Sequence, residues 1–478
     1  MAFRDTVIVF DCGATNVRAV AIDHRGKILA SHAVPNNTRA DPLFPEYRIW
    51  DVDEIWAKMC EASRKILAGI DPQRIGGLTV TTFGVDGTLF DTEGRMLYPV
   101  ISWQCERTKP IMEGIGKYID TEELYGETGV LPFNFNTINK LIWFMENKPD
   151  LVDKSFRFLF MPSIFAQRLT GEMVNDATMT GTSMLTSLGS RKLSDNILGK
   201  IGFPPERFGS IAESGSIIGT VTKSAAGETN LPAGIPVVAT GHDTQFAIFG
   251  SGAGKDQPVL SSGTWEILMV RSSGFRTGKE QLNLGVTTEF DSLPGLYNIG
   301  KQWIASGIIE WIRKNFFRDI TSDAYDEMIV GASEVPAGSN GITIVPDFCE
   351  EIAGRSGGQI RGLTLESTRY EVFRAALEAL SEKLAGGRKA LEDAGGFVTE
   401  SIICVGGGSK NRLWNQLRAD SAGVPIIITG QKETTVLGAS LFVQAAIGNY
   451  ASPEEARKDV EYNREIIEPG ANEQFRPK

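Results

Sequence analysis

The chain opens with three runs of β-forming residues separated by short polar turns. Thr6–Phe10, Val17–Ile22 and Lys27–His32 are rich in apolar side chains, and each gap between them contains a glycine beside polar residues. The second gap, Asp23–Gly26, has the composition of a tight hairpin turn. Apolar runs of this length bounded by turn residues are typical of strands. The sequence therefore predicts three strands joined by hairpins.

Apolar positions then recur with the spacing of a helix. Asp51 precedes a segment in which Ile55 and Met59 share one helical face, and an acidic residue three positions after Asp51 resembles a capping box. The apolar Ile75–Thr82 predicts a buried strand, and Thr137–Asn147 predicts an amphipathic helix that ends before a proline.

The last third of the chain alternates between the two kinds of pattern. Helices are predicted at Ser367–Ala394, Asn411–Ala422 and Thr434–Ile447, and strands at Ser401–Val405 and Pro425–Thr429. Such alternation indicates an α/β fold with a largely parallel sheet.

A second hairpin lies about half a chain after the first. Pro258–Val270 is again a strand, a turn of small residues and a strand, and its turn repeats the glycine and threonine of the opening turn. We therefore predict two related domains, at residues 1–245 and 246–478.

Charge and cysteine content exclude several classes of function. The 478 residues include 59 acidic and 48 basic side chains, a net charge of -11, and no basic run. A nucleic-acid partner is not expected, because phosphate backbones need concentrated positive charge. The five cysteines form no CxxC unit, and no apolar stretch is long enough to cross a membrane. These features predict reduced thiols and a cytoplasmic protein without a membrane partner.

The two hairpin turns carry the chemistry of a phosphate site. Gly13 and Gly263 would let the backbone approach an anion, and Thr15 and Thr264 offer hydroxyl donors. Asp11 is placed to hold Mg²⁺ through water. Each turn alone is also compatible with an ordinary hairpin, so the pair is more informative than either one.

A third glycine-rich turn follows a predicted strand at Gly406–Ser409. It lacks the GxGxxG spacing of a dinucleotide site, and no GxxxxGK[ST] phosphate loop occurs in the chain. These glycines would let an adenine and its ribose lie against the backbone. The alternative is a tight strand-to-helix turn.

The best candidate for a catalytic side chain is Asp243, within Gly-His-Asp-Thr-Gln after an apolar run. Phosphoryl transfer to an alcohol needs an acceptor for the hydroxyl proton, and Asp243 fits that role. Of the three histidines, His242 is the one expected to touch a substrate. The alternative for Asp243 is a helix cap.

Taken together, these motifs resemble the FGGY family of carbohydrate kinases. Phe135–Trp143 is similar to the family's first signature, and Gly358–Leu363 with Glu371–Glu378 is similar to its second. The resemblance covers nearly the whole chain. It implies two ribonuclease-H-like domains, as in actin, hexokinase and heat-shock ATPases, with a cleft between them that binds ATP, Mg²⁺ and a sugar.

The resemblance also implies roles for individual residues. Asp243 is expected to be the catalytic base and Asp11 the metal-side acid. The phosphate-binding residues are expected to be Gly13, Ala14, Thr15, Asn16, Gly263 and Thr264. The adenosine site is expected to contain Gly407, Gly408 and Asn411. The sugar pocket is expected to contain Gly84, Asp86, Arg107 and His242, with Phe83 and Trp103 as candidate packing surfaces.

One segment departs from the family pattern. Many members have Trp-x-Asp-x-Arg where this chain has Trp103-Gln-Cys-Glu-Arg107, so Cys105 replaces the usual aspartate. The role of Arg107 at the sugar is therefore less well supported than that of His242.

Within the family, the segments Thr81–Gly87, Gly241–Phe246 and Ser261–Val270 resemble those of kinases that phosphorylate the 1-hydroxyl of 6-deoxy-ketoses. The expected reaction converts L-fuculose and ATP to L-fuculose 1-phosphate and ADP. The alternatives are L-rhamnulose or another ketose or polyol as acceptor, and a non-metabolic ATPase of the same fold. Some family members are dimers, so a homodimer is compatible with the resemblance.

Overall fold

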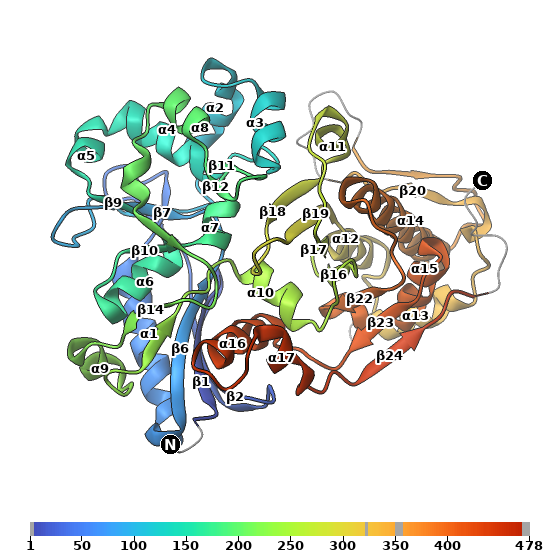
Figure 1. Ribbon diagram of the computed structural model, residues 1–478. Helices are drawn as coiled ribbons and strands as arrows, with labels where there is room; N and C mark the ends of the chain where they lie inside the picture. Colours follow the sequence, from blue (N-terminus) through green and yellow to red (C-terminus); the bar gives the residue numbers. More distant parts are fainter. Residues whose placement is uncertain (1–3, 321–323, 349–356, 471–478) are drawn as a thin grey trace.

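The chain folds into two lobes that lie side by side (Figure 1). The computed structural model describes residues 4–320, 324–348 and 357–470. Each lobe is built around one large mixed sheet, covered by helices.

The sheet of the first lobe has six strands. Across the sheet they are β14 (Ile217–Thr220), β15 (Pro236–Val238), β6 (Ile75–Thr82), β1 (Thr6–Cys12), β2 (Asn16–Asp23) and β3 (Ile28–Pro35). All residues of β1 and β6 are buried, as their continuous apolar runs predict for central strands.

The sheet of the second lobe has seven strands. Across it they are β18 (Thr287–Phe290), β19 (Tyr297–Ile304), β17 (Trp265–Ser272), β16 (Val259–Ser262), β22 (Ile402–Val405), β23 (Ile426–Thr429) and β24 (Arg464–Ile467).

The two sheets repeat one topology. In the first, β1 is antiparallel to β2 and parallel to β6, which is parallel to β15. In the second, β16 is antiparallel to β17 and parallel to β22, which is parallel to β23. The edge strands β14 and β24 are antiparallel to their neighbours in both cases. The predicted duplication is confirmed.

Helices cover both sheets. Those of the first lobe's sheet are α1 (Val52–Leu67), α6 (Met161–Thr170), α9 (Lys223–Thr229), α10 (Asp243–Gly250) and α16 (Thr434–Ala446). Those of the second lobe are α11 (Lys279–Leu284), α12 (Ser306–Phe316), α13 (Ala324–Ser333), α14 (Arg369–Gly395) and α15 (Arg412–Ala422). Helix α17 (Pro453–Lys458) packs on α16. Within the described part of the chain, no helix is both long and apolar enough to span a bilayer.

A smaller layer stands above the first sheet and has its own apolar cluster. Its helices are α2 (Lys109–Glu113), α3 (Thr121–Thr128), α4 (Thr137–Asn147), α5 (Pro149–Lys154), α7 (Ala177–Gly181) and α8 (Asp195–Ile201). Short strands accompany it and the two sheets: β4 (Arg39–Ala40), β5 (Arg48–Trp50), β7 (Gly87–Phe90), β8 (Val100–Ile101), β9 (Arg157–Phe160), β10 (Val174–Asp176), β11 (Thr186–Ser187), β12 (Lys192–Leu193), β13 (Ser210–Ala212), β20 (Thr343–Val345) and β21 (Gln359–Arg361).

Helix α16 ties the end of the chain to the first lobe. It packs on α10, β1 and β6, although in sequence it lies between β23 and β24 of the second lobe's sheet. A Cβ on Gly438 would overlap the backbone carbonyl of Phe246, so α10 and α16 approach through their backbones. The domain boundary at residue 245 stays a prediction. By that boundary α16 belongs to the second domain, yet it covers the sheet of the first lobe.

The sequence predictions for elements agree with these bounds. The predicted strand Ile75–Thr82 and helix Thr137–Asn147 match β6 and α4 at both ends. Asp51 caps α1 through the backbone N–H of Glu54. The alternative interpretation of Asp243 as a helix cap is wrong, because His242 occupies the cap position and Asp243 is the first residue of α10. The described cysteines Cys12, Cys60, Cys105 and Cys404 are buried free thiols, and Cys349 lies outside the described residues.

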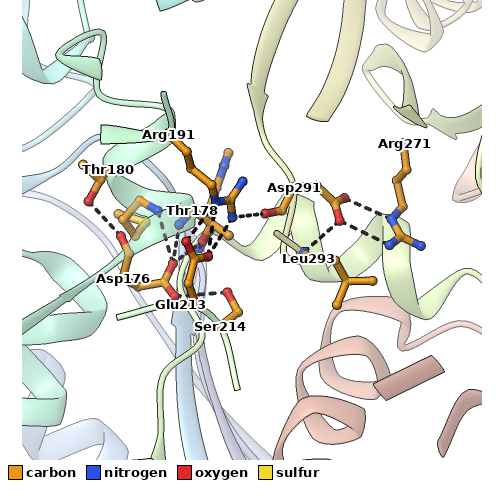
Figure 2. Close-up of polar contacts among 11 residues, drawn as sticks. Asp176, Thr178, Thr180, Arg191, Glu213, Ser214, Arg271, Asp291 and Leu293 are labelled. Carbon is orange, nitrogen blue, oxygen red and sulfur yellow. Dashed lines mark hydrogen bonds and ion pairs between the residues drawn. The ribbon is translucent and has the colours of Figure 1, made fainter. Parts of the chain in front are cut away.

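A polar bridge joins the lobes (Figure 2). Arg191 of the first lobe forms an ion pair with Glu213 and donates to the backbone carbonyl of Asp291 at 2.7 Å. The Asp291 carboxylate, in the second lobe, pairs with buried Arg271 at 3.0 Å. This bridge fixes β18, and the residues it carries, against the first lobe.

Candidate active site

A cavity of about 610 Å³ lies between the two lobes. The first lobe contributes Phe83, Gly84, Val85, Trp103, Val130, Leu131, Phe133, Phe135, Asn136, Thr182, His242, Asp243 and Thr244 to its lining. The second lobe contributes Trp265, Ile267, Met269, Thr287, Glu289, Gly300, Lys301 and Gln302. A volume of this size suits a small ligand in a largely aromatic and aliphatic pocket with a few polar groups.

Asp243 stands where this cavity meets a smaller one of about 160 Å³. The smaller cavity is also lined by Ser261, next to the second hairpin turn, and by Val405, which precedes the third glycine-rich turn. A carboxylate at this junction can face one ligand in each cavity at the same time.

The surroundings of Asp243 favour its protonated form more than water would. Burial raises the pKa of the Asp243 carboxyl, and the negative charge of Asp11 raises it further. The neighbouring His242 and hydrogen bonds from Thr244 act in the opposite direction without cancelling the rise. A carboxyl whose pKa is raised toward neutrality is better suited to accept a proton at physiological pH.

Asp11, at the end of β1, lies close enough to Asp243 for their charges to interact. Its carboxylate accepts a hydrogen bond from Arg18 Nε at 3.1 Å, and Arg18 also pairs with Glu433, just before α16, at 2.8 Å. Burial is the main reason why the pKa of Asp11 is raised, and Arg18 opposes the rise. Two acidic side chains thus lie within electrostatic range of each other at this site.

His242 connects Asp243 to the second lobe. Its Nε2 lies 3.4 Å from Asp243 Oδ1, and its Nδ1 lies 3.6 Å from Glu289 Oε2. Burial acts to lower the pKa of His242, but the surrounding carboxylates raise it overall. Glu289 is itself held by Gln245 Nε2 at 2.6 Å, so the histidine is placed between two fixed carboxylates.

The two hairpin turns are held by hydrogen bonds to their carbonyl oxygens. In the first turn, the Asn36 side chain donates to the carbonyl of Gly13 at 3.0 Å. In the second, the backbone N–H groups of Ala305 and Gly307, where α12 begins, donate to the carbonyl of Thr264 at 3.0 and 3.2 Å. The main chain of each turn is therefore fixed before any ligand binds.

The third glycine-rich turn packs on the second hairpin. Gly408 lies so close to Ser262 that a Cβ would overlap the serine hydroxyl. Gly407 has open space where a side chain would be. The Asn411 side chain caps α15 through the backbone N–H of Trp414 at 3.0 Å. The predicted phosphate and adenosine turns of the second lobe are thus neighbours.

The predicted sugar residues fall into two groups. Gly84 and His242 line the large cavity, whereas Asp86 and Arg107 do not. Asp86 is fully buried in an ion pair with Lys140, and it accepts a hydrogen bond from Trp50 Nε1 at 2.7 Å. Arg107 is buried against Asp41 at 2.7 Å. Both pairs are buried, and their members lie outside the lining of the cavity.

Several lining residues were not predicted from the sequence. Glu289 and Gln302 bring polar groups from the second lobe, and Phe133, Phe135 and Trp265 add aromatic surface. Glu289, Gln302 and Phe133 belong to no motif recognised in the sequence, whereas Phe135 and Trp265 stand in segments that resemble the family but had no role assigned to them. Only the packing of the lobes brings them together.

Comparison with known proteins identifies this arrangement. Residues 6–250 match the N-terminal domain of the FGGY family of carbohydrate kinases, and residues 259–447 match its C-terminal domain. The chain belongs to this family. It is a carbohydrate kinase, an enzyme that transfers a phosphoryl group to a sugar hydroxyl, as the sequence predicted.

Full-length relatives support this membership. The kinase is 42% identical to L-fuculokinase of Escherichia coli K12 over 472 residues, which cover 99% of each chain. It is 43% identical to L-fuculokinase of Salmonella typhi over 96% of each chain. A rhamnulokinase of Halalkalibacterium halodurans is 27% identical over 86% of this chain and 87% of that one.

Solved structures confirm the fold. The kinase matches a xylulose kinase from Rhodospirillum rubrum with a TM-score of 0.89 at 22% identity, over 98% of this chain and 94% of that one. The predicted pair of ribonuclease-H-like domains is thereby confirmed.

Proposed function

We propose that this kinase phosphorylates the 1-hydroxyl of L-fuculose with ATP, giving L-fuculose 1-phosphate and ADP. The observation that carries the chemistry is the position of Asp243, which lines both a sugar-sized cavity and a second, smaller one whose lining includes Ser261 and Val405, close to two of the glycine-containing turns. The choice of L-fuculose rests on the similarity to L-fuculokinases along the whole chain.

Asp243 is the proposed catalytic base. It takes the proton of the sugar 1-hydroxyl as the oxygen forms a bond to the terminal phosphorus of ATP, and the bond from that phosphorus to the bridging oxygen breaks. A positioned base of this kind contributes about 100- to 10,000-fold. His242, between Asp243 and Glu289, keeps the carboxylate oriented toward the cavity.

The phosphates of ATP are proposed to lie between the first turn (Gly13–Asn16) and the second (Gly263 and Thr264). Backbone N–H groups and hydroxyls of such turns suit an anion. The adenosine is proposed to lie on Gly407 and Gly408, because open space surrounds Gly407 while Gly408 packs this turn against Ser262. The cap that Asn411 provides for α15 keeps that turn in place.

A magnesium ion fits the acidic residues present. The described residues contain no group of three or more His, Cys, Asp or Glu side chains able to hold a metal. Mg²⁺ in kinases, however, is usually bound through one or two carboxylates together with phosphates and water. Asp11 would hold it. When bound, it would supply positive charge to the phosphates.

The sugar is proposed to contact Gly84 and His242, with its methyl group against the aromatic wall that includes Phe83 and Trp103. Direct contacts from Asp86 and Arg107 stay predictions, since both side chains are engaged in buried ion pairs. The cytoplasmic location and a homodimer also stay predictions.

A coupled assay of ADP release over a sugar panel tests the function. L-fuculose should give the highest kcat/KM among L-fuculose, L-rhamnulose, D-xylulose and glycerol, and omission of sugar should reduce ADP release to background. A preference for L-rhamnulose would reassign the enzyme to the other 6-deoxy-ketose. ADP release that is equally fast without any sugar would refute the kinase function.

A further inference from the structure

A buried carboxylate below the catalytic segment has no role in the chemistry described so far. Asp176 ends β10 and caps α7, and only 3% of its surface is exposed. It accepts hydrogen bonds from the backbone N–H of Thr178 at 2.7 Å, the Thr178 hydroxyl, the backbone N–H of Met179 at 3.3 Å and the Ser214 hydroxyl at 3.1 Å (Figure 2). All four donors are uncharged.

The Thr178 hydroxyl links Asp176 to the active site. A hydroxyl has a single proton, and that of Thr178 points to Asp176. The oxygen lone pairs therefore face away from the carboxylate, and one accepts the backbone N–H of His242 at 2.9 Å. His242 immediately precedes Asp243, the first residue of α10.

The packing at Gly241 shows independently that the main chain leading to Asp243 lies directly against Asp176 and Thr178. A Cβ at this position would come within 2.5 Å of the Thr178 hydroxyl oxygen and closer still to the Asp176 carboxylate. On its other side, the Gly241 carbonyl accepts hydrogen bonds from the Thr82 backbone at 3.0 Å and the Thr81 hydroxyl at 2.9 Å. The main chain that leads to Asp243 is thus held between α7 and the end of β6.

We propose that Asp176 and Thr178 are positioning residues for the catalytic base. The carboxylate orients the hydroxyl, the hydroxyl holds the His242 N–H, and this link sets where α10 begins and where the Asp243 carboxylate stands between the two cavities. The inference rests on the proposed role of Asp243. Displacement of a reacting group by about 1 Å can cost about 100-fold in rate, so a link of this kind has catalytic consequences.

The test compares Thr178→Val with Thr178→Ser. Valine has nearly the shape of threonine but cannot accept the His242 N–H, whereas serine can. With L-fuculose and ATP saturating, we expect Thr178→Val to lower kcat by about 10- to 100-fold and Thr178→Ser to restore it to within about 3-fold of the parent. The dissociation constant of a non-hydrolysable ATP analogue should change by less than about 3-fold in both, because the link does not touch the glycine-rich turns.

Thr180→Val is the matched control. It makes the same chemical change two residues further along α7, where the hydroxyl donates to the backbone carbonyl of Asp176 at 2.9 Å and does not reach His242. Its kcat should stay well above that of Thr178→Val. Equal losses in the two variants would show that any lost hydroxyl in α7 has the same effect, and would overturn the proposal.

Hydrogen exchange provides a readout that does not depend on the sugar. The amide of His242 should exchange faster in Thr178→Val than in Thr178→Ser, measured by mass spectrometry on peptides that span residues 240–245. If the parent phosphorylates none of the sugars but this difference appears, the proposed function fails while the link itself stands. Equal exchange in the two folded variants overturns the link.

Gly241→Ala gives a second route should Thr178→Val fail to fold. It keeps every hydrogen-bonding group but forces the segment away from the Asp176 carboxylate and the Thr178 hydroxyl. We expect kcat to fall by about 10-fold or more with unchanged affinity for the ATP analogue. Parent-like kcat in this variant would overturn the proposal.

Discussion

Removal of Lys140 should destabilise the protein in a strongly pH-dependent way. Lys140 and Asp86 are both fully buried and form an ion pair outside the lining of the large cavity. Lys140 also donates to the backbone carbonyl of Val85 at 3.0 Å, and Val85 has a left-handed backbone conformation with φ of 66°. In Lys140→Met, Asp86 loses its cation and Val85 loses one of the contacts that keep it in this conformation.

The magnitude follows from the protonation of Asp86. Burial already raises the pKa of the Asp86 carboxyl, and loss of the lysine charge raises it further. An uncompensated buried charge costs about 3–5 kcal/mol, which sets an upper limit. As long as protonation costs less than that limit, Asp86 is protonated in the folded variant. Protonation lowers the free energy of unfolding by about 1.4 kcal/mol for each pH unit above the unfolded pKa of about 3.9.

The sign of the pH dependence is therefore fixed. Because the folded pKa lies above the unfolded one, the variant is closest to the parent at acidic pH and loses stability as pH rises. Because burial already raises the pKa of Asp86 in the parent, the loss relative to the parent has upper limits of about 3 kcal/mol at pH 6 and about 5 kcal/mol at pH 7.5. The double variant Lys140→Met with Asp86→Asn should lose less than the single one at pH 7.5 and depend little on pH.

Urea titrations of parent and variants at both pH values, followed by tryptophan fluorescence, measure these losses. Lys154→Met makes the same substitution at an exposed position at the end of α5 and should stay within about 0.5 kcal/mol of the parent. A Lys140→Met protein that is as stable as the parent, or whose loss is the same at pH 6 and pH 7.5, would refute the reasoning.

Three further predictions follow from the site and the packing of the lobes. Asp243→Asn should lower kcat at least about 100-fold while the affinity for an ATP analogue is kept, and near-normal turnover would remove Asp243 from the base role. Because burial and the charge of Asp11 raise the pKa of Asp243, kcat/KM of the parent should fall with decreasing pH through a midpoint above the ordinary value of 3.8, and a midpoint at or below it would contradict the assigned base. Gly438→Ala should destabilise the protein by about 1–3 kcal/mol, since the added Cβ overlaps the Phe246 carbonyl. Gly386 has open space around it in α14, so Gly386→Ala should instead be neutral or stabilising by up to about 1 kcal/mol. Thermal unfolding of the two glycine variants measures whether each stability change has the expected sign.

The sequence determined the elements and the family. Local patterns were sufficient to predict the bounds of β6 and α4, because the apolar period and the flanking turn residues act within a few positions. The two similar hairpins predicted the duplication, which the matching strand order of the two sheets confirms. Asp243 and His242 could be singled out because an acidic residue and a histidine beside each other after an apolar run are an unusual local signal.

Only the tertiary structure decided what surrounds those residues. Glu289 and Gln302 carry no local signal, and they reach the cavity because the second lobe packs against the first. Helix α16 covers the first sheet although it is separated from β1 by more than four hundred positions. The sequence predicts Asp86 and Arg107 as sugar-binding residues, and only the structure shows that each forms a buried ion pair and lies outside the cavity lining. A linear pattern records which groups are present, whereas burial and pairing depend on contacts between distant segments, which form only when the lobes pack.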